Sequence, residues 1–510
     1  MTTVVWFKRD LRVDDHGPLH DAAADDVIPL YVVEPDYWQL PDTSERQWAF
    51  MHDSLLDLDA ALRDLGAPLI VRHGEVTAVL HRLREATGFT RLVSHEETGN
   101  DWTFQRDRAV ARWCRQQGIQ WREYRQFGVV RGPHNRDHWD HAWRRVMEAP
   151  AYPAPSLLTP ALTADPRALE SLTEPACRDQ RPCPGRQRGG MSQGQTLLAD
   201  FLEQRSRGYE KRISSPVTAW EASSRLSPHI AHGTVSLRRI IQQCRAAAAA
   251  PDIAGAHRRS LKAFRSRLHW HCHFIQKLED EPAIEFQTIH PDLEGLRNPG
   301  DWPEALERWR EGTTGWPLVD ACMRALHHSG WINFRMRAML MAVASYHLHQ
   351  HWREPTLHLA RLFTDYEPGI HYPQAQMQSG LTGINALRIY NPVLQSRKLD
   401  PEGRFIRAWV PELAEVPNEW LHTPWGLSST QRRQLGAEAY PLPLIDHEEA
   451  ARRARVRIKA WRQQHVRREV TDLVLERHGS RATRGRNRQS TGRSKRQSGS
   501  SHNAQMDLFQ

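Results

Sequence analysis

Eight prolines fall between residues 150 and 184 of this chain, at positions 150, 153, 155, 160, 166, 175, 182 and 184. Each proline removes a backbone donor and interrupts helices and central strands, so no long regular element can cross this stretch. An extended connection of this length ordinarily runs over the surface between two domains. A chain of 510 residues also exceeds what one core usually holds. We therefore expect a connector over 136–194, between one domain over 1–135 and a second over 195–475.

The residues before the connector alternate between strand-like and helix-like runs. Short β-branched runs occur at 3–7, 27–33, 69–72 and 91–94, and helical patterns lie between them near 45–65, 76–87 and 102–117. This alternation predicts an α/β domain, a doubly wound parallel sheet with helices on both faces. No GxGxxG follows the first strand, so the dinucleotide fingerprint is absent. A ligand would lie beyond the carboxyl ends of the strands, near 7–15 and 94–102.

The residues after the connector are predominantly helical, so the second domain is predicted to be all-α. Between Trp309 and Leu413, Trp, Arg, Asp and His recur at helical spacing. Buried Arg and Asp are costly unless they are paired, which predicts a polar pocket inside this domain. Ser227 followed by Pro228 predicts a helix start with Ser227 as N-cap, where free backbone N–H groups can hold an anion.

Neither the histidines nor the cysteines indicate a metal site. Helical i, i+2 spacing separates neighbours by about 200°, so of His269, His271 and His273 only the first and last could share a face. No HExxH-type carboxylate accompanies them. The six cysteines are scattered without a CxxC pair, which argues against disulfides and favours a reducing cytoplasm. No run of about 18 apolar residues predicts a membrane span.

The chain ends in a basic, low-complexity tail over 476–510, which is predicted to be disordered. Residues 481–510 hold seven Lys or Arg against one Asp, or +6 of the net charge of +9. The remaining body is only +3, so a nucleic-acid surface would be a local patch. The final residues Gln505, Leu508 and Phe509 resemble the peptide by which bacterial replication and repair proteins dock on the sliding clamp. A chance terminal sequence is the alternative.

A series of motifs resembles the cryptochrome/photolyase family, in the correct order over residues 3–470. They are Val5-Trp-Phe-Lys-Arg-Asp-Leu-Arg12, Ser224-Arg-Leu-Ser-Pro228, Trp309-Arg-Glu-Gly-Thr-Thr-Gly-Trp-Pro-Leu-Val-Asp320, Gly330-Trp331, Arg388-Ile-Tyr-Asn-Pro392 and Phe405-Ile-Arg-Ala-Trp-Val-Pro-Glu-Leu413. The resemblance implies an antenna-type α/β domain, a long connector and a helical domain that binds FAD. This division agrees with the one that the residue patterns predict.

The resemblance implies roles in FAD binding for several residues. Trp331 matches an aromatic residue that packs the flavin pocket. Arg337 and Asp365 match an ion pair against the isoalloxazine ring, and Glu367 matches an acidic position near the ribityl chain. The segment that grips the FAD phosphates is matched by Tyr209, Ser223, Ser224, Leu226 and Ser227. A flavin-free nucleic-acid-binding protein is a weaker interpretation, because these positions are retained.

The resemblance also implies lesion contacts, although several positions depart from the usual pattern. The candidate catalytic residues are Trp270 at one wall of the lesion pocket, Arg335 toward DNA, His371 at the position facing flavin N5, and Met377 in place of a second tryptophan. Arg388 is a further expected DNA contact. The usual glutamate before Trp270, arginine after it and polar residue before Arg335 are replaced by Arg267, His271 and Phe334.

The electron relay of the family is only partly matched. Trp352 corresponds to its middle tryptophan, whereas the inner and outer ones fall at Ala375 and Pro299. We therefore expect electrons to pass through Tyr372, Trp352 or other tryptophans. The acidic residue that would hold a folate antenna falls at Thr103, which leaves a flavin, a deazaflavin or no second chromophore as alternatives.

The implied function is that of a deoxyribodipyrimidine photo-lyase, a carbon–carbon lyase that splits UV-induced pyrimidine dimers, with the cyclobutane type as the leading substrate. Reduced FAD would supply the light-driven electron, and the damaged bases would flip out of the duplex to reach it. The alternatives are a cryptochrome-type blue-light photoreceptor with little or no repair and a (6-4) photolyase. Damaged DNA and the sliding clamp are the expected partners of a cytoplasmic monomer.

Overall fold

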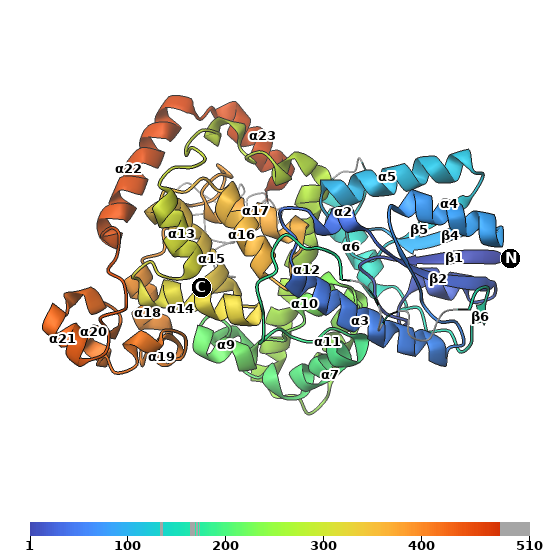
Figure 1. Cartoon of the computed structure of the whole chain (residues 1–510), viewed down its shortest axis with the longest axis horizontal. Coiled ribbons are helices and arrows are strands. Elements are labelled where there is room, and N and C mark those ends of the chain that lie inside the picture. The colour runs from blue at the N-terminus through green and yellow to red at the C-terminus, as the bar shows by residue number, and fades with distance from the viewer. Residues whose placement is uncertain (133–135, 164–168, 170–171, 173, 480–510) are drawn as a thin grey trace, which may run out of the picture.

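The structure is a computed structural model that describes residues 1–132, 136–163, 169, 172 and 174–479. The expected clamp-binding residues Gln505, Leu508 and Phe509 lie outside the described residues. An α/β domain and a helical domain lie side by side (Figure 1). Within the described part of the chain, no helix is long and apolar enough to cross a membrane.

The α/β domain contains the predicted parallel sheet. Its strands are β1 Thr2–Phe7, β2 Asp26–Val33, β3 Ile70–His73, β4 Arg91–His95 and β5 Gln120–Tyr124, in the order β3-β2-β1-β4-β5. The strand order reverses between β1 and β4, which are directly paired. The loops after these two strands therefore open a crevice at the carboxyl edge, where such sheets bind ligands.

Helices cover both faces of this sheet. They are α1 Gly17–Ala22, α2 Pro35–Trp38, α3 Glu45–Asp64, α4 Val76–Thr87 and α5 Asp101–Gln116. Val4 and Val5 point to opposite faces of β1, and both are buried, each in a different core cluster. Burial on both faces explains the unbroken apolar runs from which the sheet was predicted.

The range predicted as connector holds more regular structure than its prolines suggested. Helix α6, Trp139–Glu148, lies inside it because Trp139, Trp143 and Met147 form a buried i, i+4, i+8 stripe. A short strand, β6 Thr159–Pro160, pairs with β2. Helix α7 begins at Met191, four residues before the predicted start of the helical domain.

The helical domain runs from α7 to α23. Its helices are α7 Met191–Asp200, α8 Tyr209–Arg212, α9 Pro216–Ala222, α10 Ser227–Ala231, α11 Leu237–Ala249, α12 Gly255–Asp280, α13 Pro303–Glu311, α14 Pro317–Ser329, α15 Phe334–Ala342, α16 Arg353–Leu362, α17 Pro368–Gln378, α18 Pro392–Leu399, α19 Arg404–Trp409, α20 Asn418–Leu421, α21 Ser429–Gln434, α22 His447–His465 and α23 Arg468–His478.

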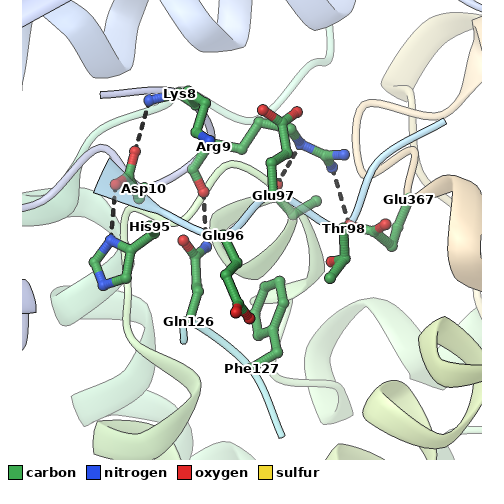
Figure 2. A pocket seen from close by; sticks show the side chains of 11 residues that line it. Lys8, Arg9, Asp10, His95, Glu96, Glu97, Thr98, Gln126, Phe127 and Glu367 are labelled. Atoms are coloured by element: carbon green, nitrogen blue, oxygen red, sulfur yellow. Dashed lines mark hydrogen bonds and ion pairs between the residues drawn. The ribbon is translucent and has the colours of Figure 1, made fainter. Parts of the chain in front are cut away.

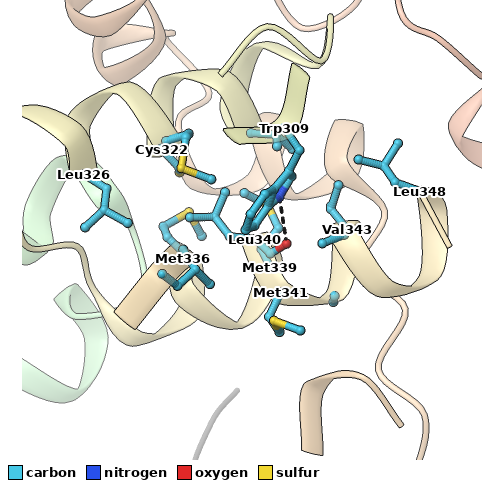
Figure 3. Packing of buried hydrophobic residues seen from close by; sticks show 14 of the residues in the cluster. Trp309, Cys322, Leu326, Met336, Met339, Leu340, Met341, Val343 and Leu348 are labelled. Atoms are coloured by element: carbon cyan, nitrogen blue, oxygen red, sulfur yellow. Dashed lines mark hydrogen bonds between the residues drawn. The ribbon is translucent and has the colours of Figure 1, made fainter. Parts of the chain in front are cut away.

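The core of this domain surrounds Trp309 (Figure 3). The Trp309 indole is fully buried and its Nε1 donates to the carbonyl of Leu340 at 3.1 Å. Cys322 of α14 and Met336 and Met339 of α15 pack in the same cluster. This packing fixes the α14–α15 corner, from which Trp331 to Arg337 enter the candidate site.

Polar side chains of the α/β domain join the two domains. Arg9 donates from Nε to the carbonyl of Ala231 at 2.8 Å and from NH2 to the carbonyl of Tyr366 at 3.0 Å. Arg46 reaches the carbonyls of Leu326, His327 and Leu362 at 3.2–3.3 Å. Gly233 has φ of +66°, and a Cβ there would lie 2.2 Å from the Arg9 carbonyl oxygen, so only glycine permits this close approach.

Candidate functional site

A cavity of about 1950 Å³, including its open mouth, lies within the helical domain. Residues of α8, α12, α15 and α17 line it together with the segments 223–231 and 331–333. It brings together most of the residues that the sequence predicted for the site, namely Tyr209, Ser223, Ser224, Ser227, Trp270, Trp331, Arg335, Arg337, Asp365, Glu367 and His371. The predicted polar pocket is thus one continuous cavity.

The remaining predicted residues do not line this cavity. Leu226 is fully buried in the core beneath the 223–227 segment, and Trp352 is buried in the Trp309 cluster. On α17, residues 371, 374, 375 and 378 face the cavity at i, i+3, i+4 and i+7. Met377 and Tyr372 lie at other positions around the same helix, and both are buried. Arg388 is half-buried in the segment before α18 and lies outside the lining.

The segment expected to grip phosphates is not organised by the predicted N-cap. Leu226 is the N-cap of α10 and Ser227 is its first residue, and α10 has only five residues. The hydroxyl of Ser227 instead accepts a hydrogen bond from Trp331 Nε1 at 3.2 Å. The prediction failed because Arg225 adopts a left-handed conformation with φ of +57°, which turns the chain two residues before the helix.

Arg225 is a lining residue to which the sequence analysis gave no role. Its guanidinium carbon lies 4.3 Å from the Trp220 ring and 4.2 Å from the Trp331 ring, so the cation is held between two indoles. Burial lowers the pKa of Arg225 to about 9, and Asp365 opposes that shift. Arg225 stands within the Ser224-Arg-Leu-Ser-Pro228 motif, and its place in that motif could have identified it as a site residue.

Arg337 and Asp365 form a bidentate ion pair at the wall of the cavity. The two N–H···O distances are 2.9 and 2.8 Å. Arg337 also donates from Nε to the Ile332 carbonyl at 2.7 Å and lies 4.1 Å from the Phe363 ring. Each member thus balances the charge of the other at a partly buried position.

Glu367 links this cavity to a smaller one at the domain boundary (Figure 2). Its Oε2 accepts from Arg9 NH2 at 3.1 Å. Burial raises the pKa of Glu367 to about 7, although the Arg9 cation opposes the shift. The carboxyl group can therefore exchange a proton near neutral pH at the edge of the large cavity.

Two lining amides present buried acceptors that no described residue satisfies. The Asn333 amide nitrogen donates to the carbonyls of Ile213 and Ser214, both at 3.0 Å, which orients Oδ1 as the free acceptor. Gln378 Oε1 is likewise buried without a partner among the described residues. Unsatisfied buried acceptors are costly, so both indicate a ligand that carries N–H or O–H donors.

The wall that was predicted to face a lesion is aromatic. Trp270 packs against His273 and Phe274 of the same helix at ring-centroid distances of 4.9 and 5.9 Å. His271 also lines the cavity, and burial lowers its pKa to about 3, so it is neutral. Arg335 and the exposed Phe334 begin α15 at this cavity. This arrangement suits a flat, apolar ligand that lies against the aromatic rings beside the Arg335 cation.

Two histidine-containing groups outside the cavity lining bear on the question of a metal site. His269 Nε2 lies 2.9 Å from an Asp140 oxygen. In the described part of the chain, one group of three side chains is close enough to share a metal ion: Asp10, His16 and His95. The Leu19 amide donates to His16 Nδ1, so His16 Nε2 carries the proton and donates to Asp10 at 2.9 Å. Asp10, His16 and His95 thus form a buried hydrogen-bond network.

A further cavity of about 590 Å³ opens at the strand crevice of the α/β domain. Trp6, Tyr37 and Arg106 line it, and the Arg106 guanidinium lies 4.9 Å from the Trp6 ring. Arg106 is held by Glu34 and Glu97 at 3.1 and 2.6 Å. The predicted position Thr103 lies in the first turn of α5, where its hydroxyl donates to the carbonyl of the N-cap residue Asn100 at 2.9 Å, and it is not among the lining residues.

Comparisons with known proteins identify both domains. The family model "DNA photolyase" matches residues 3–131, and "FAD binding domain of DNA photolyase" matches residues 264–460. A deoxyribodipyrimidine photo-lyase from Streptomyces griseus is 30% identical over 466 residues, which cover 88% of this chain and 97% of the relative. Cryptochrome-2 from Arabidopsis thaliana is 29% identical and covers 88% of this chain and 77% of its own.

Solved structures share the fold. A class III photolyase from Agrobacterium tumefaciens superimposes with a TM-score of 0.74 at 24% identity, over 91% of this chain and 98% of its own. A photolyase from Sulfolobus tokodaii with two FAD molecules gives a TM-score of 0.73 at 25% identity, over 90% of this chain and all of its own. The predicted fold class, an α/β domain joined to a helical FAD-binding domain, is confirmed.

Proposed function

The chain belongs to the cryptochrome/photolyase family, and we propose on that basis that it is a light-dependent DNA repair flavoprotein that splits cyclobutane pyrimidine dimers. The observation that carries the proposal is the large cavity of the helical domain. It combines a partly buried Arg–Asp pair, unsatisfied amide acceptors and an aromatic wall. The first two features suit a flavin, and the aromatic wall suits the flat surface of a pyrimidine dimer.

The residues of the cavity fit FAD, and each has a distinct part in holding it. Asn333 and Gln378 would accept hydrogen bonds from the cofactor, because their oxygens lack other partners. Arg337, balanced by Asp365, would place a positive group beside the ring system without adding net charge. The hydroxyl of Ser224 would donate to a phosphate oxygen, whereas Ser223, which also lines the cavity, already donates its hydroxyl proton to the Ala219 carbonyl at 2.6 Å. When bound, FAD supplies the light-driven electron transfer.

The substrate would enter at the aromatic wall. Trp270 would stack against an extruded dimer, and Arg335 would contact the phosphates around it. Arg388, outside the lining, would contribute to the same phosphate surface. Met377 is buried and away from the lining, so we assign lesion contact to Trp270 and Arg335 before Met377.

A cryptochrome-type photoreceptor is the second candidate, and a specific observation favours it. Cryptochrome-2 from Arabidopsis thaliana matches 88% of the chain at 29% identity, which is nearly the identity of the photo-lyase relative from Streptomyces griseus. A (6-4) photolyase is a third candidate, although Asn333 and Phe334 stand where that class would carry paired histidines.

We further propose a second chromophore in the cavity beside Trp6, with a flavin or a deazaflavin as candidates. The photolyase from Sulfolobus tokodaii was solved with two FAD molecules, which supports a flavin as the candidate. The tail peptide around Gln505, Leu508 and Phe509 is proposed to bind the sliding clamp, and the basic residues before it would raise the effective concentration at DNA. We also propose that the protein is a monomer and that it is located in the cytoplasm.

One experiment separates the candidates. The purified protein is assayed for bound flavin, reduced chemically and illuminated with DNA that carries either cyclobutane dimers or (6-4) products. Repair of cyclobutane dimers is the expected result. Repair of (6-4) products alone would replace the proposal by the third candidate. Bound flavin with repair of neither lesion would replace it by the photoreceptor.

A further inference from the structure

Two buried tyrosines of the helical domain share one carboxylate of the α/β domain. The hydroxyls of Tyr366 and Tyr372 both donate to Asp42 Oδ2, the second at 3.1 Å. The exposed fractions are 5% for Tyr366, 1% for Tyr372 and 1% for Asp42. The three groups therefore form a closed hydrogen-bond cluster at the boundary between the domains.

The Asp42 carboxylate has no cationic partner among the residues that the structure describes. Its only other contact is the Asn100 amide, 3.4 Å from Oδ2. Its second oxygen, Oδ1, is buried with no hydrogen-bond partner in the described chain. A buried carboxylate held by neutral donors alone is costly, because desolvation is not offset by an opposite charge.

A second Tyr–Asp pair, in the helical domain, provides a comparison in which the carboxylate is fully hydrogen-bonded. The Tyr440 hydroxyl donates to Asp320, but that carboxylate also accepts from the backbone amides of Thr314 and Gly315 at 2.7 and 2.9 Å. Both Asp320 oxygens are therefore satisfied. Neither Tyr440 nor Asp320 lines the large cavity. Asp42 keeps a free acceptor oxygen where Asp320 has none.

The cluster also stands between the two larger cavities. Tyr366 lines both the cavity of the helical domain and the cavity beside Trp6. Tyr372 follows at a ring-centroid distance of 6.5 Å from Tyr366. His371, which lines the large cavity, lies 5.4 Å from Tyr366 and 5.8 Å from Tyr372. Redox-active side chains are thus continuous from the large cavity to Asp42.

We propose that Tyr366 and Tyr372 are a redox-active pair that supplies electrons to the flavin site, with Asp42 as their proton acceptor. The inference rests on the flavin binding of the proposed function and goes beyond it. Tyr366 gives one electron to the light-excited oxidised flavin, its O–H bond breaks, and the proton forms an O–H bond on Asp42. Tyr372 can then give one electron to the Tyr366 radical: the protonated Asp42 returns its proton to Tyr366, and the carboxylate so formed takes the proton that Tyr372 releases. A soluble thiol returns one electron and one proton to the pair.

The charge change favours this coupled step. Before it, the cluster holds two neutral phenols and an anionic carboxylate; afterwards it holds a neutral phenoxyl radical and a neutral carboxylic acid. The step removes an unpaired buried charge, which a low-dielectric environment favours. Burial and the Asp42 carboxylate also raise the pKa of both phenols well above the usual value, so the resting tyrosines keep their protons.

The test is light-induced electron paramagnetic resonance of the full chain with its flavin bound and oxidised, without DNA. Protein is prepared with ordinary, ring-deuterated tyrosine or ring-deuterated tryptophan, and flavin content is measured for every sample. The variants are Tyr366→Phe, Tyr372→Phe, Asp42→Asn and the matched control Tyr440→Phe. Each Tyr→Phe change, the control included, removes one buried hydroxyl that donates a hydrogen bond to an aspartate.

Deuterated tyrosine is expected to narrow the radical signal, whereas deuterated tryptophan leaves it unchanged. Tyr366→Phe should abolish the tyrosyl signal, and Asp42→Asn should lower its yield by at least tenfold, since the proton acceptor is lost. Tyr440→Phe should match the parent protein. A signal sensitive only to tryptophan deuteration, or a tyrosyl signal that survives in Tyr366→Phe with flavin bound, would overturn the inference. Absence of flavin, or of repair by chemically reduced protein, would instead count against the proposed function.

Discussion

Replacing Asp365 by asparagine tests whether the Arg337–Asp365 pair organises the cavity. The substitution keeps the shape of the side chain but removes its charge. The Asp365 side chain is 3% exposed and that of Arg337 is 22% exposed. Arg337 would keep its bond to the Ile332 carbonyl and its contact with Phe363, but it would lose the only carboxylate with which it forms an ion pair among the described residues.

The size of the effect follows from that geometry. Breaking a fully buried pair costs about 3–5 kcal/mol, because a charge is left without compensation. Arg337 retains partial access to water, and asparagine retains one acceptor, so we expect Asp365→Asn to lower the free energy of unfolding by about 2–3 kcal/mol. A cycle with Arg337→Met should give a coupling energy of about 2 kcal/mol, since the two residues contact each other directly.

The Arg324–Glu412 pair provides a matched control. Its N–H···O distances are 2.9 and 2.8 Å and its arginine is 22% exposed, but its glutamate is 26% exposed and the pair lies outside the cavity. Glu412→Gln should therefore cost less than about 1 kcal/mol. The assay is urea unfolding with and without flavin, together with the flavin content of purified protein. The reasoning is refuted if Asp365→Asn is as stable as the parent and retains its flavin, or if Glu412→Gln costs as much.

Three further outcomes are expected. In the folded protein Glu367 has a pKa of about 7, whereas its ordinary pKa of 4.5 applies in the unfolded chain. Between these two pH values the folded state binds a proton that the unfolded state has released, so the contribution of Glu367 to the free energy of unfolding falls as pH rises from about 4.5 to 7. Glu367→Gln should reduce that pH-dependent loss by up to about 3 kcal/mol, measured by urea unfolding at pH 5 and pH 7.5; an unchanged difference contradicts the assignment. Trp270→Ala should weaken binding of dimer-containing DNA at least tenfold while flavin content is retained, measured by fluorescence anisotropy with Leu394→Ala, an exposed residue outside the lining, as control. Deletion of 504–510 should abolish binding to the sliding clamp in surface plasmon resonance, and equal affinity of the truncated chain would show that the terminal peptide is a chance sequence.

The extent of prediction differed between the domains for physical reasons. Strands β1 to β4 were predictable because their apolar runs are buried on both faces. Strand β5, Gln120–Tyr124, was missed because its residues are mostly polar and none of them is fully buried, so it lacks the apolar run of the other strands. Helix α6 was missed because the prolines that follow it led to the prediction of an irregular connector over the whole range 136–194.

In the candidate site, too, some residues could be predicted from the sequence and others could not. Trp331, Arg337 and Asp365 carry recognisable motifs, and the structure places them at one cavity. Asp42 carries none, because its role depends on two tyrosines more than 320 positions later in the chain. Tyr372 was proposed from sequence as a relay residue, but its orientation toward Asp42 is set by the rotation of α17. Residues brought together across the domain boundary have no local signature.

The interdomain contacts of Arg9 and Arg46 have a consequence for the order of synthesis. The carbonyls that Arg46 contacts lie 280 to 316 positions later in the chain, and the acceptors of Arg9 lie 222 to 358 positions later. Because domains fold as units during synthesis, the α/β domain would emerge from the ribosome with these guanidinium groups still hydrated. Docking would wait until Glu367, the last of these acceptors, is made. A ribosome-stalled chain that ends before residue 367 should therefore hold a folded first domain without the flavin cavity.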